Sequence, residues 1–227
     1  MVVLTLRGRG PNTFSLSMLR EVERELDAAG DEPLLVTGAG EAFSAGLDLD
    51  ELGTHEPAQV VELLSAMERV ARRLFLHPAP TVALVNGHAV AGGCLVAQCC
   101  DWRVGVDDDA IRIGMTGVAI GLTYPPFVVN VFRQRVPAPH LENALLGAQR
   151  VDPKRALAAG LLDELAPKDD ARKLAISRLE ARAMLPRHAY AATKRALREP
   201  LFHQTADEER RFKEETVPEW TKRLMRL

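Results

Sequence analysis

Residues 80–100 constrain the fold of this chain more than any other stretch, because they contain no Lys, Arg, Asp or Glu. A run of this length is about as long as a membrane-spanning helix, which needs ~20 apolar residues. The run is interrupted at Asn86-Gly87-His88 and again at Gly92-Gly93, and both interruptions are typical of turns. A buried strand over residues 81–85, a turn and a buried helix account for the stretch, so we expect no membrane-spanning segment.

The chain around this stretch alternates between strands and helices, which favours an α/β fold. A helix is expected from the N-cap Ser15 to Gly30, and another over residues 60–75. The expected strands, including the one already described, cover residues 2–6, 34–37, 81–85, 102–106 and 110–113. From Pro126 onward the pattern is nearly all helical, with room for one strand at 161–165. The expected helices there cover residues 127–136, 138–147, 152–159, 168–185, 189–198, 205–216 and 218–226.

The chain length of 227 residues is compatible with one domain that has a sizeable core. We therefore expect a single domain over residues 1–227, with an α/β core over 1–165 and a helical region over 166–227. The helical region either forms a separate lobe or packs on a neighbouring subunit.

Composition and charge exclude several classes of function. The formal net charge is −2 and the basic residues are scattered among acidic ones, so we expect no nucleic-acid binding. The opening MVVLTLRGRG has too short an apolar run for a secretory signal. The chain has an odd number of cysteines, Cys94, Cys99 and Cys100, and the adjacent pair Cys99 and Cys100 is poorly placed for a disulfide. We therefore expect reduced thiols and a cytoplasmic protein.

The usual motifs for cofactors, metals and nucleophiles are absent. Gly38-Ala39-Gly40 lacks the third glycine of a dinucleotide-binding loop, and no Gly-Lys-Ser/Thr triplet indicates a phosphate loop. The six histidines never occur at i, i+3 or i, i+4, and the chain has no Cys-x-x-Cys. No Gly-x-Ser-x-Gly sequence indicates a serine nucleophile. The sequence therefore predicts neither a metal site nor a resident cofactor.

The remaining possibility is chemistry carried by backbone groups, in two loops rich in small residues, 37–52 and 86–101. Small residues let a main chain approach a ligand closely, and a helix that begins at glycines presents unpaired N–H groups. Two such donors can bind an oxygen that becomes negative during a reaction, and apolar surroundings strengthen them. Taken alone, tight packing explains such glycines at least as well.

The two loops together resemble the enoyl-CoA hydratase/isomerase (crotonase) superfamily, through "AFSAGLDL" and "VNGHAVAGGCLVAQCCDWRV". The resemblance implies a spiral of ββα units, a homotrimer or a dimer of trimers, and a coenzyme A thioester as substrate. It also implies that the N–H groups of Leu47 and Gly92 hold the thioester oxygen while an enolate forms. Substrate-binding positions implied nearby are Ala45, Gly46, Asp48 and Gly93, with the role of Asp48 more structural than catalytic.

The sequence departs from this family at both usual catalytic glutamates. Their positions fall on Leu95 and Gly117, which cannot transfer protons although they remain candidates for contacting the substrate. Addition of water to a double bond needs a positioned acid and base, so a conventional hydratase is disfavoured. The resemblance implies that isomerases commonly keep only the second glutamate, which falls on Gly117, so a conventional isomerase is disfavoured only a little less. Tyr124 resembles a tyrosine that contacts the substrate carboxylate in the methylmalonyl-CoA decarboxylase branch, although a buried amphipathic residue is the alternative.

Several other polar residues have a structural interpretation beside a functional one. Asp50 and Glu51 suit a solvated helix start, and His88 suits a hydrogen bond to local backbone. Cys94 is expected to be a buried apolar thiol, and Asp101 a structural cap or salt bridge. Lys194 and Arg195 are candidates for contacting the nucleotide phosphates of coenzyme A, or are ordinary surface charges.

These observations favour an acyl-CoA enzyme that isomerises a double bond or catalyses a related hydratase/isomerase reaction. Decarboxylation of a malonyl-type thioester with Tyr124 is the first alternative. The second is a non-catalytic acyl-CoA-binding protein that kept the fold and lost its acids.

Overall fold

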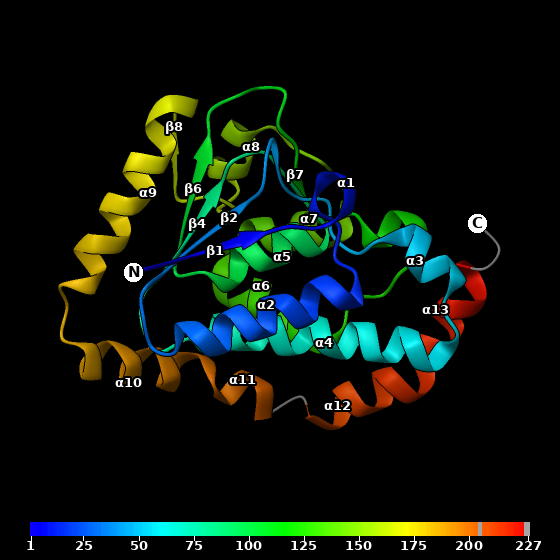
Figure 1. Ribbon diagram of the computed structural model, residues 1–227. Helices are drawn as coiled ribbons and strands as arrows, with labels where there is room; N and C mark the ends of the chain where they lie inside the picture. Colours follow the sequence, from blue (N-terminus) through cyan, green and yellow to red (C-terminus); the bar gives the residue numbers. More distant parts are fainter. Residues whose placement is uncertain (204–205, 225–227) are drawn as a thin grey trace.

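The computed structural model describes residues 1–203 and 206–224 and contains two parallel sheets (Figure 1). The larger sheet has five strands in the order β1-β2-β4-β6-β8. These strands are β1 (Val2–Leu6), β2 (Leu34–Gly38), β4 (Thr81–Val85), β6 (Trp102–Val106) and β8 (Glu164–Ala166). β2 and β4 are buried along their whole length, which explains why they have apolar runs rather than alternation.

The smaller sheet is built from the strands that follow β2, β4 and β6 along the chain. It has the order β3-β5-β7, with β3 (Ala42–Ser44), β5 (His88–Val90) and β7 (Ile113–Gly114). Successive strands thus enter the large sheet and then the small one, and a helix follows β3 and β5, as in repeated ββα units. This is the expected α/β spiral.

The first helices cover one side of the large sheet. α2 (Leu16–Ala29) packs on α4 (Pro57–Phe75), and α4 packs on α5 (Gly92–Cys99). The predicted N-cap is confirmed, because the Ser15 side chain accepts a hydrogen bond from the Met18 N–H. Two further helices are short. α1 (Arg9–Asn12) lies in a segment for which no helix was expected, whereas α3 (Leu49–Thr54) contains the helix start expected at Asp50 and Glu51.

The chain after β7 is helical as expected, apart from β8. These helices are η1 (Gly117–Ile120, a 3-10 turn), α6 (Pro126–Arg135), α7 (Ala138–Leu146), α8 (Pro153–Ala158), α9 (Lys168–Ala183), α10 (Arg187–Arg198), α11 (Pro200–His203), α12 (Ala206–Arg211), η2 (Phe212–Thr216, π-helical) and α13 (Val217–Leu224). Of the predicted ranges 205–216 and 218–226, residues 205 and 225–226 lie outside the described residues.

Three expected boundaries between residues 86 and 114 were wrong. His88 was expected in a turn but begins β5, where Ala42 of β3 pairs with it. Gly92-Gly93 was also expected to be a turn but begins α5, because Ala91 with φ 50° makes the turn instead. The strand expected at 110–113 is reduced to Ile113–Gly114. The residues before Ile113 belong instead to the turn after β6, in which the Ile111 N–H donates a hydrogen bond to the Asp108 carbonyl.

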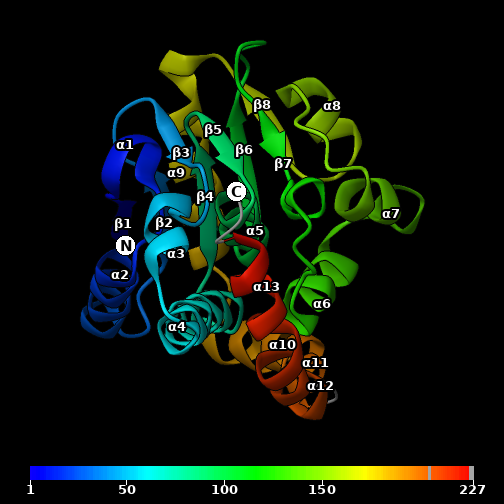
Figure 2. The same cartoon turned by 90° about the vertical axis from the view of Figure 1, so that its right-hand side faces the viewer.

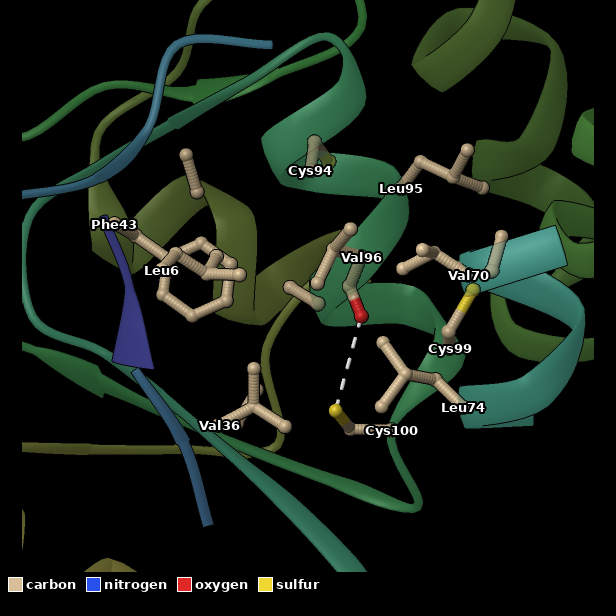
Figure 3. Close-up of a cluster of buried hydrophobic side chains, with 14 of the residues drawn as sticks. Leu6, Val36, Phe43, Val70, Leu74, Cys94, Leu95, Val96, Cys99 and Cys100 are labelled. Atoms are coloured by element: carbon tan, nitrogen blue, oxygen red, sulfur yellow. Dashed lines mark hydrogen bonds between the residues drawn. The ribbon is translucent and has the colours of Figure 1, made fainter. Parts of the chain in front are cut away.

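The charge-free stretch forms the centre of the core (Figure 3). Cys94, Cys99 and Cys100 are free and fully buried, in agreement with the expected apolar thiols. Burial raises the pKa of Cys94 and of Cys100 to about 12, so neither thiol is a nucleophile at neutral pH. Within residues 1–203 and 206–224, no helix has both the length and the apolar character needed to cross a membrane.

Candidate functional site

A cavity of about 340 Å³ opens where the two glycine loops meet. One end lies among helices, where Leu64 and Met67 of α4 face Phe127 of α6 and Trp220 of α13. The other end lies at the rim of the small sheet. Between these ends the wall consists of residues from the loops and from the start of α5, namely Ala45, Leu47, Ala91, Gly92 and Leu95.

The first loop holds the amide of Leu47 without an acceptor. Gly46 has φ 88°, and its carbonyl accepts a hydrogen bond of 2.8 Å from the Phe14 N–H. The Asp48 N–H donates to the Phe14 carbonyl at 3.1 Å, which fixes the chain on the other side of Leu47. Among the residues that the structure describes, none accepts a hydrogen bond from the Leu47 N–H.

The second loop presents the amide of Gly92 in the same way. The Ala91 N–H bonds the Gly114 carbonyl at 2.9 Å, and the Ala91 carbonyl accepts from the Leu95 N–H at 3.0 Å. Gly92 is the first residue of α5, where amides have no partner inside the helix and the helix dipole is positive. Its N–H also lacks an acceptor in the described part of the chain.

The glycines bring these two amides together. A Cβ atom at Gly46 would lie 2.8 Å from the Gly92 nitrogen, and one at Gly92 would lie 3.2 Å from the Gly46 Cα. A Cβ at Gly93 would lie 2.2 Å from the Ser44 carbonyl oxygen. Two unpartnered N–H groups at adjoining loops, with apolar walls, have the arrangement that stabilises a developing oxyanion.

No carboxylate lines this cavity in the described residues. Leu95 and Gly117, the positions of the family's usual glutamates, both lie in its wall. Tyr124 lies there as well, and its hydroxyl accepts a hydrogen bond of 2.9 Å from the Gly117 N–H. Burial raises the pKa of Tyr124, so the phenol keeps its proton at neutral pH.

Tyr124 occupies the space that a side chain at position 117 would need. A Cβ atom at Gly117 would lie 2.8 Å from the Tyr124 Cε1. Glycine at position 117 therefore leaves free the space that the ring of Tyr124 fills.

Basic side chains surround the small-sheet end of the cavity. His88, Arg112 and Arg150 contribute to its wall. The Arg112 N–H donates to the His88 Nδ1 at 2.9 Å, which agrees with the expected backbone hydrogen bond of this histidine. Arg112 and Arg150 were not among the sequence-based candidates, because no local motif marks them and their place in the cavity wall depends on the folded structure.

Four of the expected substrate-binding residues do not line the cavity. Gly46 and Gly93 lie behind its wall and allow the loops to touch. Asp48 is buried and caps α3, where it accepts hydrogen bonds from the Asp50 and Glu51 amides. Lys194 also lies outside the cavity wall, because its side chain is buried elsewhere.

Lys194 belongs to a buried ion cluster around Asp101. Its Nζ lies 2.6 Å from the Asp101 Oδ2 and also donates to the carbonyls of His77 and Ala79. Arg198 binds the other Asp101 oxygen at 2.8 Å. The salt bridge expected for Asp101 is confirmed.

The remaining acidic candidates are structural. Asp50 forms an exposed ion pair with Arg9, and the Glu51 carboxylate accepts a hydrogen bond from the Leu16 N–H at 3.3 Å. Across residues 1–203 and 206–224, no group of three or more His, Cys, Asp or Glu side chains could hold a metal ion.

Comparisons with known proteins agree with this architecture. The sequence model of the family described as "Enoyl-CoA hydratase/isomerase" matches residues 1–223. The chain is 30% identical to "Enoyl-CoA delta isomerase 1, mitochondrial" of Mus musculus over 203 residues, which cover 87% of this chain and 70% of the mouse protein. It is 38% identical to a putative enoyl-CoA hydratase of Thermus thermophilus over 161 residues, 68% of this chain and 61% of that protein.

The solved structures give the same result. The crystal structure of human mitochondrial delta3-delta2-enoyl-CoA isomerase has a TM-score of 0.90 and 25% sequence identity, covering 98% of this chain and 90% of the human one. An enoyl-CoA hydratase/isomerase family protein from Pseudomonas syringae has a TM-score of 0.88 and 26% identity, covering 94% and 93%. With its two-sheet spiral and adjoining glycine loops, the chain belongs to the enoyl-CoA hydratase/isomerase family and has the crotonase fold.

Proposed function

We propose that this protein binds an acyl-CoA thioester and stabilises its enolate through the N–H groups of Leu47 and Gly92. The observation that carries the proposal is that these two amides lack acceptors in the described residues and lie at loops in van der Waals contact. The cavity beside them is mostly apolar, which strengthens a hydrogen bond to a charged oxygen. Coenzyme A enters as part of the substrate, and the chemistry needs no further cofactor.

Isomerisation of a double bond, or a related hydratase/isomerase reaction, is the favoured reaction. The names of the mouse and human relatives, both enoyl-CoA isomerases, support it. Leu95 in the cavity wall weighs against a conventional hydratase, because water addition needs an acid and a base at the reacting carbons.

Decarboxylation of a malonyl-type thioester is the second candidate, and the hydrogen bonding of Tyr124 favours it. The bond between the carboxylate and the α-carbon breaks, carbon dioxide leaves, and the electron pair stays as the enolate without any base. Because the Tyr124 oxygen accepts from the Gly117 amide, its own proton is available for a partner in the cavity. That proton suits either a hydrogen bond to the departing carboxylate or protonation of the α-carbon after carbon dioxide has left.

A non-catalytic acyl-CoA-binding protein is the alternative from another class. It would bind the same thioesters in the same cavity without exchanging an α-proton. The absence of carboxylates from the described cavity wall is the observation that keeps this alternative open.

Exchange of the α-proton tests the enzyme proposal. The protein is incubated in deuterated water with saturated, 2-enoyl, 3-enoyl and malonyl-type coenzyme A thioesters, and products are analysed by mass spectrometry. Gly92→Pro removes the amide, while Gly92→Ala keeps it and introduces a similar Cβ 3.2 Å from the Gly46 Cα. We expect Gly92→Pro to lose at least about a hundredfold more rate than Gly92→Ala, the typical value of one oxyanion donor.

The pattern of substrates then distinguishes the candidates. Deuterium in 3-enoyl or 2-enoyl thioesters supports isomerisation, and turnover of the malonyl-type thioester alone supports decarboxylation. Binding without exchange or product for the whole panel contradicts the enzyme proposal and favours the binding protein.

We also propose that the chain forms a homotrimer or a dimer of trimers in the cytoplasm. The resemblance of its loops to the crotonase superfamily supports the assembly, and three buried free thiols suit a reducing compartment. Sedimentation equilibrium of the purified protein distinguishes a monomer from either assembly.

A further inference from the structure

The C-terminal helices form the wall at the apolar end of the cavity. Trp220 of α13 lines the cavity together with Met67 of α4 and Phe127 of α6, and it is only 5% exposed. Figure 2 shows α13 between α4 and α6, at the front of that view. Residues 206–224, here called the strap, therefore separate this end of the cavity from solvent.

Side-chain contacts attach the strap to the helices beneath it. The Glu209 carboxylate accepts a hydrogen bond from the Phe127 N–H in the first turn of α6. Lys213 forms an ion pair with Glu68 of α4 at 2.5 Å. Within the strap, the ring of Phe212 packs edge-on against Trp220 with centroids 5.4 Å apart.

Burial of Glu209 makes this attachment costly. The residue is 8% exposed, and its Oε2 is buried without a hydrogen-bond partner among the described residues. A buried, unpaired carboxylate oxygen is strongly unfavourable, and protonation of the carboxyl removes the charge. The Trp220 Nε1 is also buried without a partner in this part of the chain, so the closed strap leaves two polar groups unsatisfied.

The charges facing Glu209 do not compensate for its burial. Glu68 on α4 and Glu208 on α12 repel a negative charge there, while Lys213 on η2 and the Phe127 amide of α6 attract it. Burial has the largest effect and, with Glu68, raises the pKa of Glu209 to about 7. The carboxyl is therefore partly protonated at neutral pH when the strap is closed.

We propose that residues 206–224 open and close the apolar end of the cavity, and that protonation of the Glu209 carboxyl favours the closed state. Opening exposes the carboxyl to water, where its pKa returns toward the ordinary 4.5. The extra stability of the closed state is complete below that value and falls as the pH rises toward 7. Over that range the closing constant decreases by about tenfold per pH unit, and above it the constant is level.

The inference rests on the proposed function only for what fills the opened end, which would be the acyl group of the thioester. Closure itself depends on the chain alone. Its test therefore uses the free protein, so that a failure to bind acyl-CoA leaves the result intact.

Hydrogen exchange measured by mass spectrometry between pH 5 and 8 tests the strap. After correction for the intrinsic exchange rate, the opening constant of peptides within residues 206–224 should rise about fortyfold between pH 5 and 7. Glu209→Gln, which keeps an acceptor for the Phe127 amide without a charge, should abolish this dependence. Glu208→Gln removes a charge from the exposed neighbouring position and should keep it.

Peptides from β4 and α5 serve as the reference for global unfolding. If they open with the same pH dependence as residues 206–224, the strap is not an independent element and the inference is wrong. A flat profile in the wild-type protein, or an unchanged slope in Glu209→Gln, would also overturn it.

Discussion

At the scale of single residues, Gly46 combines two constraints that can be separated by mutation. Its φ of 88° disfavours any side chain, and a Cβ would lie 2.8 Å from the Gly92 nitrogen. Gly40 has a similar φ of 65° with nothing within 4 Å of its Cβ position. We expect Gly40→Ala to cost about 1–2 kcal/mol from backbone strain.

Gly46→Ala should cost about 1–3 kcal/mol more than Gly40→Ala, because overlap with Gly92 is added to the strain. It should also reduce thioester turnover, since the two amides move apart. Urea denaturation and the deuterium assay measure both effects. Equal stability of the two variants would show that the loops are not in contact.

Gly117 and Tyr124 form a second pair whose coupling can be measured. Gly117→Ala places a Cβ 2.8 Å from the Tyr124 ring and should destabilise the protein by about 1–3 kcal/mol through overpacking. In the Tyr124→Ala background the same change should cost much less. A double-mutant cycle of unfolding free energies gives the coupling, and additive effects would contradict it.

This pairing also determines which substitutions would give the protein hydratase activity. Glutamate at position 117 needs room that Tyr124 now occupies. Hydration of a 2-enoyl thioester by the Leu95→Glu, Gly117→Glu variant should therefore require Tyr124→Ala as well. The sequence predicted that Leu95 and Gly117 replace acids, but a list of residues cannot indicate that Tyr124, seven positions away, fills the vacated volume.

At the scale of elements, the cap of α3 links the first loop to stability. Asp48 accepts hydrogen bonds from the Asp50 and Glu51 amides and from the Thr13 hydroxyl. Asp48→Ala should lower the unfolding free energy by about 1–2 kcal/mol. Asp152→Ala is the matched control, because the Asp152 side chain caps α8 in a comparable way by accepting a hydrogen bond from the Arg155 amide.

Only Asp48→Ala should also lower thioester turnover, because α3 carries Leu49 into the cavity wall. Burial opposes ionisation of Asp48, but the hydrogen bonds from Glu51, Thr13 and Asp50 hold its pKa below the ordinary 3.8. Its contribution is therefore complete above pH 3.8 and is lost as the pH falls through the lower value of the folded state. If Asp48→Ala lowers the unfolding free energy by the same amount at pH 7 and pH 2.5, loss of the cap is not the cause of the destabilisation.

Elements with strong local signals were predicted well, and elements defined by long-range pairing were not. α2 has an N-cap and regular apolar spacing, so its limits followed from nearby residues. β8 was expected at 161–165 but lies at Glu164–Ala166, because its register depends on β6, about sixty residues earlier. β7 has only two residues and is a strand because β5 pairs with it.

At the scale of the whole molecule, Asp101 connects the core to the C-terminal region. It accepts hydrogen bonds from Tyr190, Lys194 and Arg198 of α10, at 2.7, 2.6 and 2.8 Å. Burial opposes its charge, but Lys194 and Arg198 lower the pKa of Asp101 below the ordinary 3.8. The sequence predicted a partner for Asp101 without identifying it, since these partners lie about ninety residues away.

Lys194→Met distinguishes this structural role from binding of the coenzyme A phosphates. Removing one partner of a buried ion pair typically costs about 3–5 kcal/mol, so the variant should unfold at lower urea concentration. Its affinity for coenzyme A, measured by calorimetry at a temperature where it remains folded, should equal that of the wild type. Arg195→Met changes the adjacent exposed cation, whose partner is Glu199 at 3.9 Å, and should alter neither quantity. Weaker binding by folded Lys194→Met would instead mean that Lys194 leaves Asp101 to meet the ligand, and that α10 moves with it.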